Sequence, residues 1–321
     1  MSTGNRYVVV GAGAIGGLIA ARLVRRGSSV IACDADRDHV EAMNRHGLRI
    51  EGPVDTFEVP MEAVLPENLP EAITGPVILA VKAQHTSAAM DLLAGKIHHQ
   101  EGFVVSLQNG LTVDAISAYV GASRVVPGMI NVSADYLAPG RIFLGGQGTF
   151  VAGETNGQFS DRLELLVKDI DGLERTTNIC GYRWSKLAYS AILAATAVSG
   201  VPIADALAMP RYRGVWRSLL DGVLTGATAS LEAFDGFDPY DFEGSLSNMV
   251  SFNRKSAKKH SGIYRDLVVR RRPTEVSAQL GRVDSPAVKE LLHTISKIER
   301  GELKCSLATL DMMAERMGVR L

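Results

Sequence analysis

Short apolar runs, each followed by a polar or helix-like segment, dominate the first half of the chain. The four clearest runs stand at residues 7–10, 29–33, 76–81 and 103–107. They are apolar at nearly every position, as parallel strands are when both faces of their sheet are covered. Segments with helical spacing follow the first two runs. This order predicts a doubly wound α/β domain built on a mostly parallel sheet.

The strand pattern weakens after the fourth run and disappears from Gly181 onward. Weaker strand-like pieces come first, at residues 125–128, 141–144, 149–152 and 173–179, with a helix at 157–170 between the last two. We expect antiparallel edge strands among the first three pieces, because turns containing glycine separate them. Helical spacing then continues at residues 182–198, 212–234, 264–271, 275–280, 285–300 and 306–317. We therefore predict an α/β domain at residues 1–178 and an all-α domain at 179–321.

Composition narrows the class of protein. Hydrophobic residues make up 46% of the 321 residues and charged residues 21%, which excludes a largely disordered chain. A formal net charge of −1 argues against a nucleic-acid or membrane-surface binder. The apolar segment 187–203 contains Ser, Thr and Pro202, so we interpret it as a buried helix. The three cysteines indicate neither a disulfide framework nor a zinc site, and we expect no metal. A cytoplasmic, homodimeric enzyme is the expectation.

A glycine-rich turn follows the first apolar run. Its sequence, Gly11-Ala12-Gly13-Ala14-Ile15-Gly16, has the spacing of a dinucleotide-binding fingerprint. Gly11 permits the turn, Gly13 lets the backbone approach a pyrophosphate, and Gly16 packs the following helix against the strand. Asp34 stands at the end of the second strand. Its separation in sequence from the glycine motif is close to the roughly 20 residues expected for an acid that binds the ribose hydroxyls. An ordinary glycine turn is the alternative, but the flanking strands favour a Rossmann-type domain that binds a dinucleotide.

Polar residues follow two further strands. Lys82 comes after the third apolar run and Asn109 after the fourth. Ligands of open α/β sheets lie beyond the carboxyl ends of the strands, so Gly11, Lys82 and Asn109 should converge on one crevice. A solvated loop charge and a turn-forming asparagine beside Gly110 are the alternatives.

Lys186 is the candidate proton donor. An enzyme that reduces a carbonyl needs a group to protonate the oxygen, and a lysine does this well when burial and neighbours lower its pKa. Lys186 stands near the start of the first helix of the second domain and shares a face with Ser190 and Ala194. A lysine that only extends its charge to solvent from a packed helix is the alternative.

Four motifs together resemble the ketopantoate reductase family (2-dehydropantoate 2-reductases). They are the glycine-rich turn, Ala80-Val81-Lys82-Ala83, Leu107-Gln108-Asn109-Gly110 and Trp184-Ser185-Lys186-Leu187. The resemblance covers essentially the whole chain and implies a Rossmann domain, a helical domain and a substrate bound between them. It implies that Lys186 is the general acid, that Asn109 positions nicotinamide and substrate, and that Lys82 lies near the cofactor. Glu275 matches the family glutamate that stabilises the lysine and contacts the cofactor.

The substrate pocket departs from the family pattern. The family has asparagines one and two turns after its lysine, where this chain has Ser190 and Ala194. Its asparagine-glycine-glutamate stretch becomes Ile203-Ala204-Asp205, and its serine pair is replaced in the segment 259–266. We expect the substrate to be bound by Ser190, Lys259, His260, Ser261 and Arg265. The basic run 270–272 is either a solvated helix end or a substrate or phosphate contact.

These features favour a nicotinamide-dependent oxidoreductase that interconverts a carbonyl, such as a 2-oxo acid, and a secondary alcohol. Asp34 would accept bonds from ribose hydroxyls and repel a 2′-phosphate, so NAD(H) is expected over NADP(H), with Arg37 softening the preference. Two alternatives stay open: reduction of 2-dehydropantoate itself, and a non-catalytic protein that senses NAD(P). Retention of Lys186, Asn109 and Glu275 disfavours the sensor. The sequence leaves the substrate and the physiological direction undetermined.

Overall fold

The computed structural model describes residues 6–256 and 258–321. The chain forms two compact units, and the division falls after Ile179. The expected boundary lies one residue earlier.

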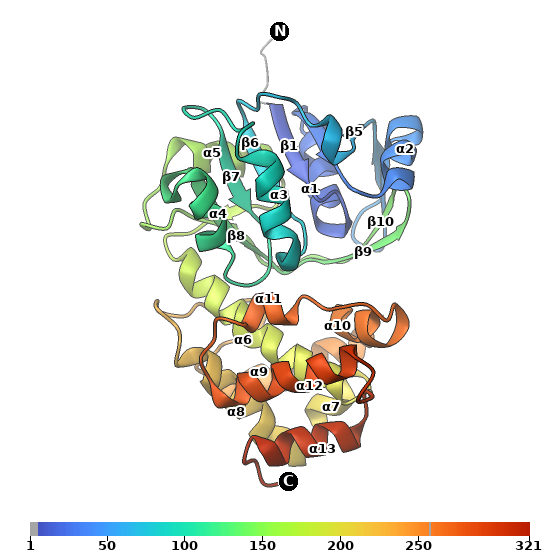
Figure 1. Ribbon diagram of the computed structural model, residues 1–321, viewed down its shortest axis with the longest axis vertical. Coiled ribbons are helices and arrows are strands. Elements are labelled where there is room, and N and C mark those ends of the chain that lie inside the picture. The colour runs from blue at the N-terminus through green and yellow to red at the C-terminus, as the bar shows by residue number, and fades with distance from the viewer. Residues whose placement is uncertain (1–5, 257) are drawn as a thin grey trace. The chain divides into compact units, whose positions relative to one another are not determined.

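An eight-stranded sheet forms the centre of the first unit, in the order β12-β11-β8-β7-β6-β1-β2-β5 (Figure 1). The strands are β1 (Arg6–Val10), β2 (Ser29–Cys33), β5 (Glu62–Val64), β6 (Pro76–Leu79), β7 (Phe103–Ser106), β8 (Val125–Ile130), β11 (Phe150–Ala152) and β12 (Glu174–Arg175). The six strands from β5 to β8 are parallel, and β11 joins β8 antiparallel. The strand order reverses at β1, so the doubly wound α/β fold is confirmed.

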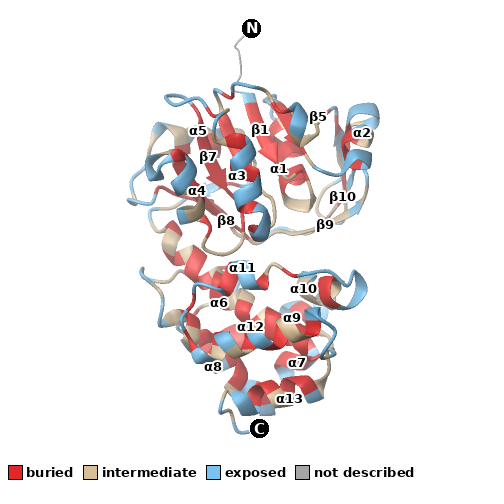
Figure 2. Ribbon diagram, in the orientation of Figure 1, coloured by how far each residue is buried: buried red, intermediate tan, exposed pale blue. Residues whose placement is uncertain are grey.

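Alternating side chains of β1 enter two separate cores. Tyr7 and Val9 belong to the core on one face of the sheet, and Val8 and Val10 to the core on the other. The first core receives α1 (Ala14–Arg25), α2 (Arg37–His46) and α5 (Asp161–Asp169), and the second receives α3 (Thr86–Leu93) and α4 (Val113–Val120). The sheet is therefore buried on both faces, as Figure 2 shows by its red strands, which is why the strands are apolar throughout.

A second sheet packs on α1. It contains β4 (Phe57–Val59), β3 (Leu48–Glu51), β10 (Arg141–Gly146) and β9 (Ser133–Ala138), in that order. The run 141–144, expected at the edge of the main sheet, lies in this one instead. A side chain on Gly17 of α1 would overlap Ile142 of β10, so the glycine permits the close approach.

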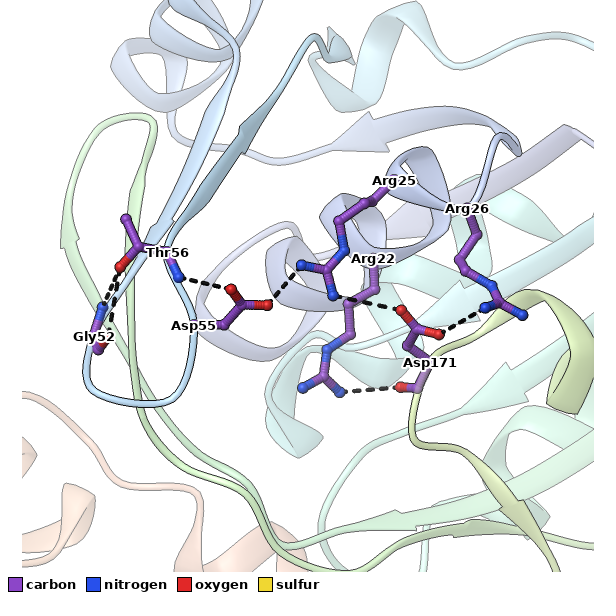
Figure 3. A network of polar contacts seen from close by, with 7 residues as sticks. All are labelled: Arg22, Arg25, Arg26, Gly52, Asp55, Thr56 and Asp171. Carbon is purple, nitrogen blue, oxygen red and sulfur yellow. Dashed lines mark hydrogen bonds and ion pairs between the residues drawn. The ribbon is translucent and has the colours of Figure 1, made fainter.

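Three arginines near the end of α1 bind two distant loops (Figure 3). Arg25 pairs with Asp55 at 2.6 Å, and both Arg25 and Arg26 approach the carboxylate of Asp171. Buried Arg22 donates to the backbone oxygen of Asp171 at 3.1 Å. The network holds the end of α1 to the loop between β3 and β4 and to the loop before β12.

Helices make up the second unit, as predicted. They are α6 (Ile179–Val198), α7 (Ile203–Ala208), α8 (Arg213–Leu224), α9 (Phe242–Lys255), α10 (Gly262–Tyr264), α11 (Val276–Leu280), α12 (Pro286–Glu299) and α13 (Leu307–Arg316), with a π-helical turn at Arg265–Val269. Short 3₁₀ helices stand at Pro66–Asn68, Ala83–His85, Ala122–Arg124 and Pro210–Tyr212. Within residues 6–256 and 258–321, no helix, α6 included, has the length and apolarity needed to cross a membrane.

Several expected element bounds were wrong. The helix expected at 212–234 ends at Leu224, and α9 was not predicted. Only two residues of the expected strand 173–179 are strand, because Ile179 already begins α6. Ser285 occupies the N-cap of α12 and Pro286 the first helical position, but the Ser285 hydroxyl makes no capping bond.

The basic run 270–272 has a structural partner. Arg270 and Arg272 pair with Asp266 at 3.1 and 2.9 Å, and that carboxylate is buried. A buried carboxylate needs such partners, because an unpaired charge away from water is costly. Two of the three arginines therefore hold the π-helical turn.

Candidate functional site

The glycine-rich turn forms a tight passage from β1 into α1. Gly11 has φ +89°, and a side chain there would stand 2.7 Å from the backbone nitrogen of Val81. The amides of Gly11 and Ala12 both donate to the carbonyl oxygen of Cys33, at 2.9 and 3.2 Å. The turn is thus bonded to the end of β2 and pressed against the end of β6.

The next two glycines of the motif meet different demands. A side chain on Gly16 would overlap the carbonyl oxygen of Gly11, so protein packing alone requires a glycine there. At Gly13, the N-cap of α1, no described atom beyond its own neighbours in the chain lies within 4 Å of the position a Cβ would take. Neither a side-chain cap nor an acidic residue occupies the first turn of α1 in the described chain. Ala14 and partly buried Ile15 begin the helix.

The ends of β6 and β7 are bonded together beside this turn. Buried Gln108 donates to the carbonyl oxygen of Val81 at 3.0 Å and to the hydroxyl of Thr86 at 2.8 Å. The backbone of Ala80 in turn donates to Val10, at the end of β1. Lys82 and Asn109 follow these ends and are both partly buried. The first unit therefore carries Gly11, Lys82 and Asn109 at the carboxyl ends of adjacent strands.

Acidic residues gather at the end of β2. Asp34 accepts a bond from the backbone of Asp36 at 3.0 Å, and the hydroxyl of Tyr136 donates to the Asp36 carboxylate at 3.0 Å. Burial, the hydrogen bond to Asp36 and the charges of Asp36, Asp34 and Asp38 raise the pKa of Tyr136 well above its usual range. Asp34, Asp36 and Asp38 thus place three carboxylates near Tyr136.

Buried His39 supports the glycine turn from behind. Its Nε2 lies 2.9 Å from the carbonyl oxygen of Ala12, and its Nδ1 accepts the amide of Gly140 at 2.9 Å. A nitrogen that accepts an N–H carries no proton, so Nε2 is the donor to Ala12. His39 was not singled out from the sequence. Its place beside Val40 and four residues before Met43, on the apolar face of α2, is the sequence signal that could have identified it.

Lys186 lies on α6 in an aromatic setting in the second unit. Its Nζ stands 5.0 Å from the ring centre of Tyr189 and 5.7 Å from that of Phe234. Burial lowers the pKa of Lys186 to about 8, while the carboxylates of Asp235 and Glu275 act to raise it and Lys258 acts to lower it. The amine is therefore mostly protonated at neutral pH, with a pKa far closer to neutrality than that of an exposed lysine.

The groups around Lys186 come from separate segments. Glu275 is the N-cap of α11 and is partly buried. Asp235 lies in the turn after α8. The sequence did not indicate it as a neighbour of Lys186, because the helical spacing predicts a helix through residue 234. The Asp235-Gly236 pair was the available signal, since this dipeptide favours a tight turn.

The departures from the family pattern at Ser190, Ala194 and Ile203 lie on α6 and α7. Ser190 is partly buried, whereas Ala194 and Ile203 are buried. The backbone of Ile203 donates to the carbonyl oxygen of Lys259 at 2.9 Å, which brings the segment 258–261 next to the start of α7. An apolar surface therefore replaces amide groups at Ala194 and Ile203.

The expected substrate residues on the segment 259–265 have different surroundings. Exposed Lys259 donates through Nζ to the carbonyl oxygen of Arg254 at 2.8 Å, and the Ser261 hydroxyl caps α10. His260 stacks on Tyr264, with ring centres 4.0 Å apart, and burial lowers its pKa while Asp205 opposes the change. Arg265 is partly buried at the start of the π-helical turn. Ser261 thus has a local structural role.

Known families match both units. The profile described as "Ketopantoate reductase PanE/ApbA" matches residues 7–157, and the profile of the C-terminal part of the same family matches residues 178–288. A 2-dehydropantoate 2-reductase of Mesorhizobium japonicum is 27% identical over 245 residues, which span 67% of this chain and 73% of that protein.

Solved structures share the fold. A PanE/ApbA family ketopantoate reductase from Ralstonia eutropha JMP134 has a TM-score of 0.77 at 21% identity and covers 92% of this chain and 99% of its own. D-mandelate dehydrogenase in complex with NADH and anilino(oxo)acetate has a TM-score of 0.73 at 18% identity, with coverage of 98% and 97%. At these identities the likeness concerns the fold.

Proposed function

The chain belongs to the ketopantoate reductase family of oxidoreductases, and we propose that it uses a nicotinamide cofactor to interconvert a carbonyl and a secondary alcohol. In this proposal Lys186 is the general acid and base, and Asn109 and Glu275 complete the catalytic group. The site residues named below are part of the same proposal.

The state of Lys186 carries the proposal. General acid catalysis is most effective when the pKa of the donor lies near the working pH. Burial brings the pKa of Lys186 to about 8, and two carboxylates keep the ammonium charged near neutrality. A lysine that only extended its charge into solvent would be neither buried nor close to the carboxylates of Asp235 and Glu275. These features support proton transfer.

The glycine turn fits the pyrophosphate of a dinucleotide. The amides at the start of α1 have no described side-chain cap, and the helix dipole favours an anion there. Gly13 is not demanded by protein packing, which supports a role in close approach of a ligand to the backbone. Asp34 would accept the ribose hydroxyls, and Lys82 and Asn109 would line the nicotinamide side.

The acidic surroundings of Asp34 support NAD(H) over NADP(H). A 2′-phosphate at that place would meet Asp34 together with Asp36 and Asp38, all of which act on Tyr136. Like charges disfavour such binding. Arg37, exposed in the first turn of α2, is a cation close in sequence to Asp34 and would soften the preference.

In the proposed reaction, the glycine turn and Asp34 would hold a nicotinamide cofactor, which when bound would supply the hydride for the carbonyl carbon. Lys186 donates its Nζ proton to the carbonyl oxygen, and the product is the secondary alcohol. Glu275 keeps the ammonium charged and oriented, and Asn109 holds the carbonyl by its side-chain amide. In the reverse direction the neutral Lys186 amine accepts the proton from the alcohol.

The pocket supports a substrate other than 2-dehydropantoate. Ala194 and Ile203 offer no hydrogen bonds where the family uses asparagines, and a site without such partners discriminates against a small hydroxylated acid. Ser190, Lys259, His260, Ser261 and Arg265 would supply donors for a carboxylate attached to a larger or more apolar body. A 2-oxo acid with an apolar side chain fits this description.

A panel assay tests the proposal. Purified protein is offered NADH or NADPH with 2-oxo acids of increasing apolar size, and 2-dehydropantoate is included. We expect the highest kcat/KM for an apolar 2-oxo acid. A value for 2-dehydropantoate in the range of about 10⁴ to 10⁸ M⁻¹s⁻¹ that is typical of natural substrates would instead identify it as the substrate.

The panel assay, together with calorimetry and light scattering, separates the remaining alternatives. The family membership keeps authentic 2-dehydropantoate reduction as the second candidate. A protein that binds cofactor in calorimetry but turns over no member of the panel would support the non-catalytic sensor. Gel filtration with light scattering would test the expected homodimer.

A further inference from the structure

A tight turn after α8 lies against the helix that carries Lys186. Phe234 and Phe237 exchange two backbone hydrogen bonds, of 2.9 and 2.8 Å, around Asp235 and Gly236. Both central residues have positive φ, +46° at Asp235 and +78° at Gly236. This is the geometry of a two-residue hairpin turn, for which Asp-Gly and Asn-Gly are the preferred pairs.

Aromatic packing fastens this turn to α6. Tyr189, one turn after Lys186, meets the rings of Phe234 and Phe237 edge to face, with centres 5.7 and 5.4 Å apart. Both phenylalanines are buried. The ring of Phe234 also lies 5.7 Å from Lys186 Nζ. Asp235 therefore follows directly after Phe234, a buried residue that packs against both Tyr189 and Lys186.

Hydrogen bonds hold the turn from two further sides. Buried Ser185, the residue before Lys186, accepts the backbone amide of Glu232 at 3.1 Å. The side chain of Asn248 on α9 donates to the carbonyl oxygen of Gly236 at 2.9 Å. The position of Asp235 relative to α6 is therefore determined by packing and bonding and does not depend on the Asp235 side chain.

We propose that Asp235 is a positioning residue for Lys186, whose carboxylate, together with that of Glu275, holds the lysine ammonium charged and oriented for proton transfer. The inference rests on the proposed role of Lys186 as proton donor. The turn itself needs a residue that tolerates positive φ, which Asn satisfies as well as Asp. The turn therefore does not require the negative charge of the Asp235 carboxylate.

The charges that face Lys186 are consistent with this role. Asp235 and Glu275 favour the charged amine, Lys258 opposes it, and burial opposes it most. Asp235 also acts on Tyr189, where burial first and then this carboxylate raise the pKa to about 12. The Asp235 carboxylate therefore acts on both Lys186 and Tyr189 of α6.

The substitution Asp235→Asn tests the proposal. It removes the charge and keeps a preferred turn residue, so the thermal unfolding midpoint should stay near that of the wild type. With the carboxylate gone, the midpoint of the pH profile for carbonyl reduction should move to lower pH by about one unit. The rate at pH 9 should then fall by about tenfold, with little change at pH 6 and a small effect on KM.

A matched control and a second readout separate the outcomes. Asp284→Asn removes an exposed carboxylate of the same unit and should leave the profile unchanged. NMR of protein with isotope-labelled lysine, in which Lys186→Ala identifies the signal, follows the titration of the amine without reference to turnover. A shifted titration in Asp235→Asn alone supports the proposal.

Two results would overturn it. Titration and pH profile equal to those of the wild type in Asp235→Asn, with Lys186→Ala inactive, would remove Asp235 and leave the proposed function intact. Full activity of Lys186→Ala would remove the proposed function, and the positioning role of Asp235 with it.

Discussion

The buried imidazole of His39 is bonded to the carbonyl oxygen of Ala12, in the glycine-rich turn, at 2.9 Å. His39→Leu would leave both that oxygen and the amide of Gly140 without their partner. Each buried group so orphaned costs about 1 to 3 kcal/mol. We expect a loss of roughly 2 to 5 kcal/mol in urea unfolding and weaker cofactor binding. His46→Leu, at an exposed position of the same helix, is the control and should change little.

Two glycines of the turn should respond differently to alanine. At Gly16 the new methyl group would overlap the carbonyl oxygen of Gly11, so Gly16→Ala should unfold at clearly lower denaturant concentration. At Gly13 no described atom beyond its neighbours in the chain lies within 4 Å of the new methyl group, so Gly13→Ala should fold normally and bind cofactor more weakly. Denaturation and calorimetric titration with NADH measure the two effects. Unchanged NADH affinity in Gly13→Ala would exclude a close contact of the cofactor with this backbone.

Replacement of Lys186 should abolish proton transfer with little effect on cofactor binding. Lys186→Ala should lose roughly 10²- to 10⁴-fold in kcat, the range usual for general acid-base groups. Lys186→Arg should be nearly as slow, because a guanidinium holds its proton too tightly to donate it. Lys304→Ala, at an exposed site of the same unit, is the control. Turnover of Lys186→Ala equal to that of the wild type would exclude the lysine from the mechanism.

The two directions of the reaction should have opposite pH dependence. Because burial lowers the pKa of Lys186 to about 8, the amine is protonated below this pH and neutral above it. Carbonyl reduction needs the proton, so its kcat/KM should fall above pH 8. Alcohol oxidation needs the neutral amine, so its kcat/KM should rise through the same pH. Rates measured from pH 6 to 10 in both directions test this prediction. Two flat profiles would count against Lys186 as the general acid and base.

Cofactor preference should depend on Asp34. We expect kcat/KM to be higher with NADH than with NADPH, because a 2′-phosphate would face the carboxylates near the end of β2. Asp34→Ala should reduce the ratio by lowering affinity for NADH and easing NADPH binding. Asp114→Ala, a carboxylate in the first turn of α4, serves as control. A wild-type preference for NADPH would contradict the prediction.

Much of the fold was predictable because its signals are local. The apolar strands 7–10, 29–33, 76–79 and 103–106 identified a sheet buried on both faces. The positive φ of Gly11 and the approach of Gly16 to the carbonyl oxygen of Gly11 arise within one strand, turn and helix, so their spacing in the sequence sufficed. The bounds of the second-unit helices were less reliable. The helix expected through residue 234 stops at Leu224, two residues before Gly226, and the Phe234–Phe237 turn begins at the last residue of the expected helix.

The sequence by itself determined the doubly wound sheet, the glycine turn, the helical second unit and Lys186 as the residue to examine. Tertiary structure decided what depends on residues far apart in the chain. It brought Asp235 and Glu275 to Lys186, and the pKa of a lysine follows from burial and neighbouring charge, which no local pattern encodes. It also placed β10 in a second sheet and His39 behind Ala12, since strand pairing and buried hydrogen bonds join segments whose separation in sequence is arbitrary.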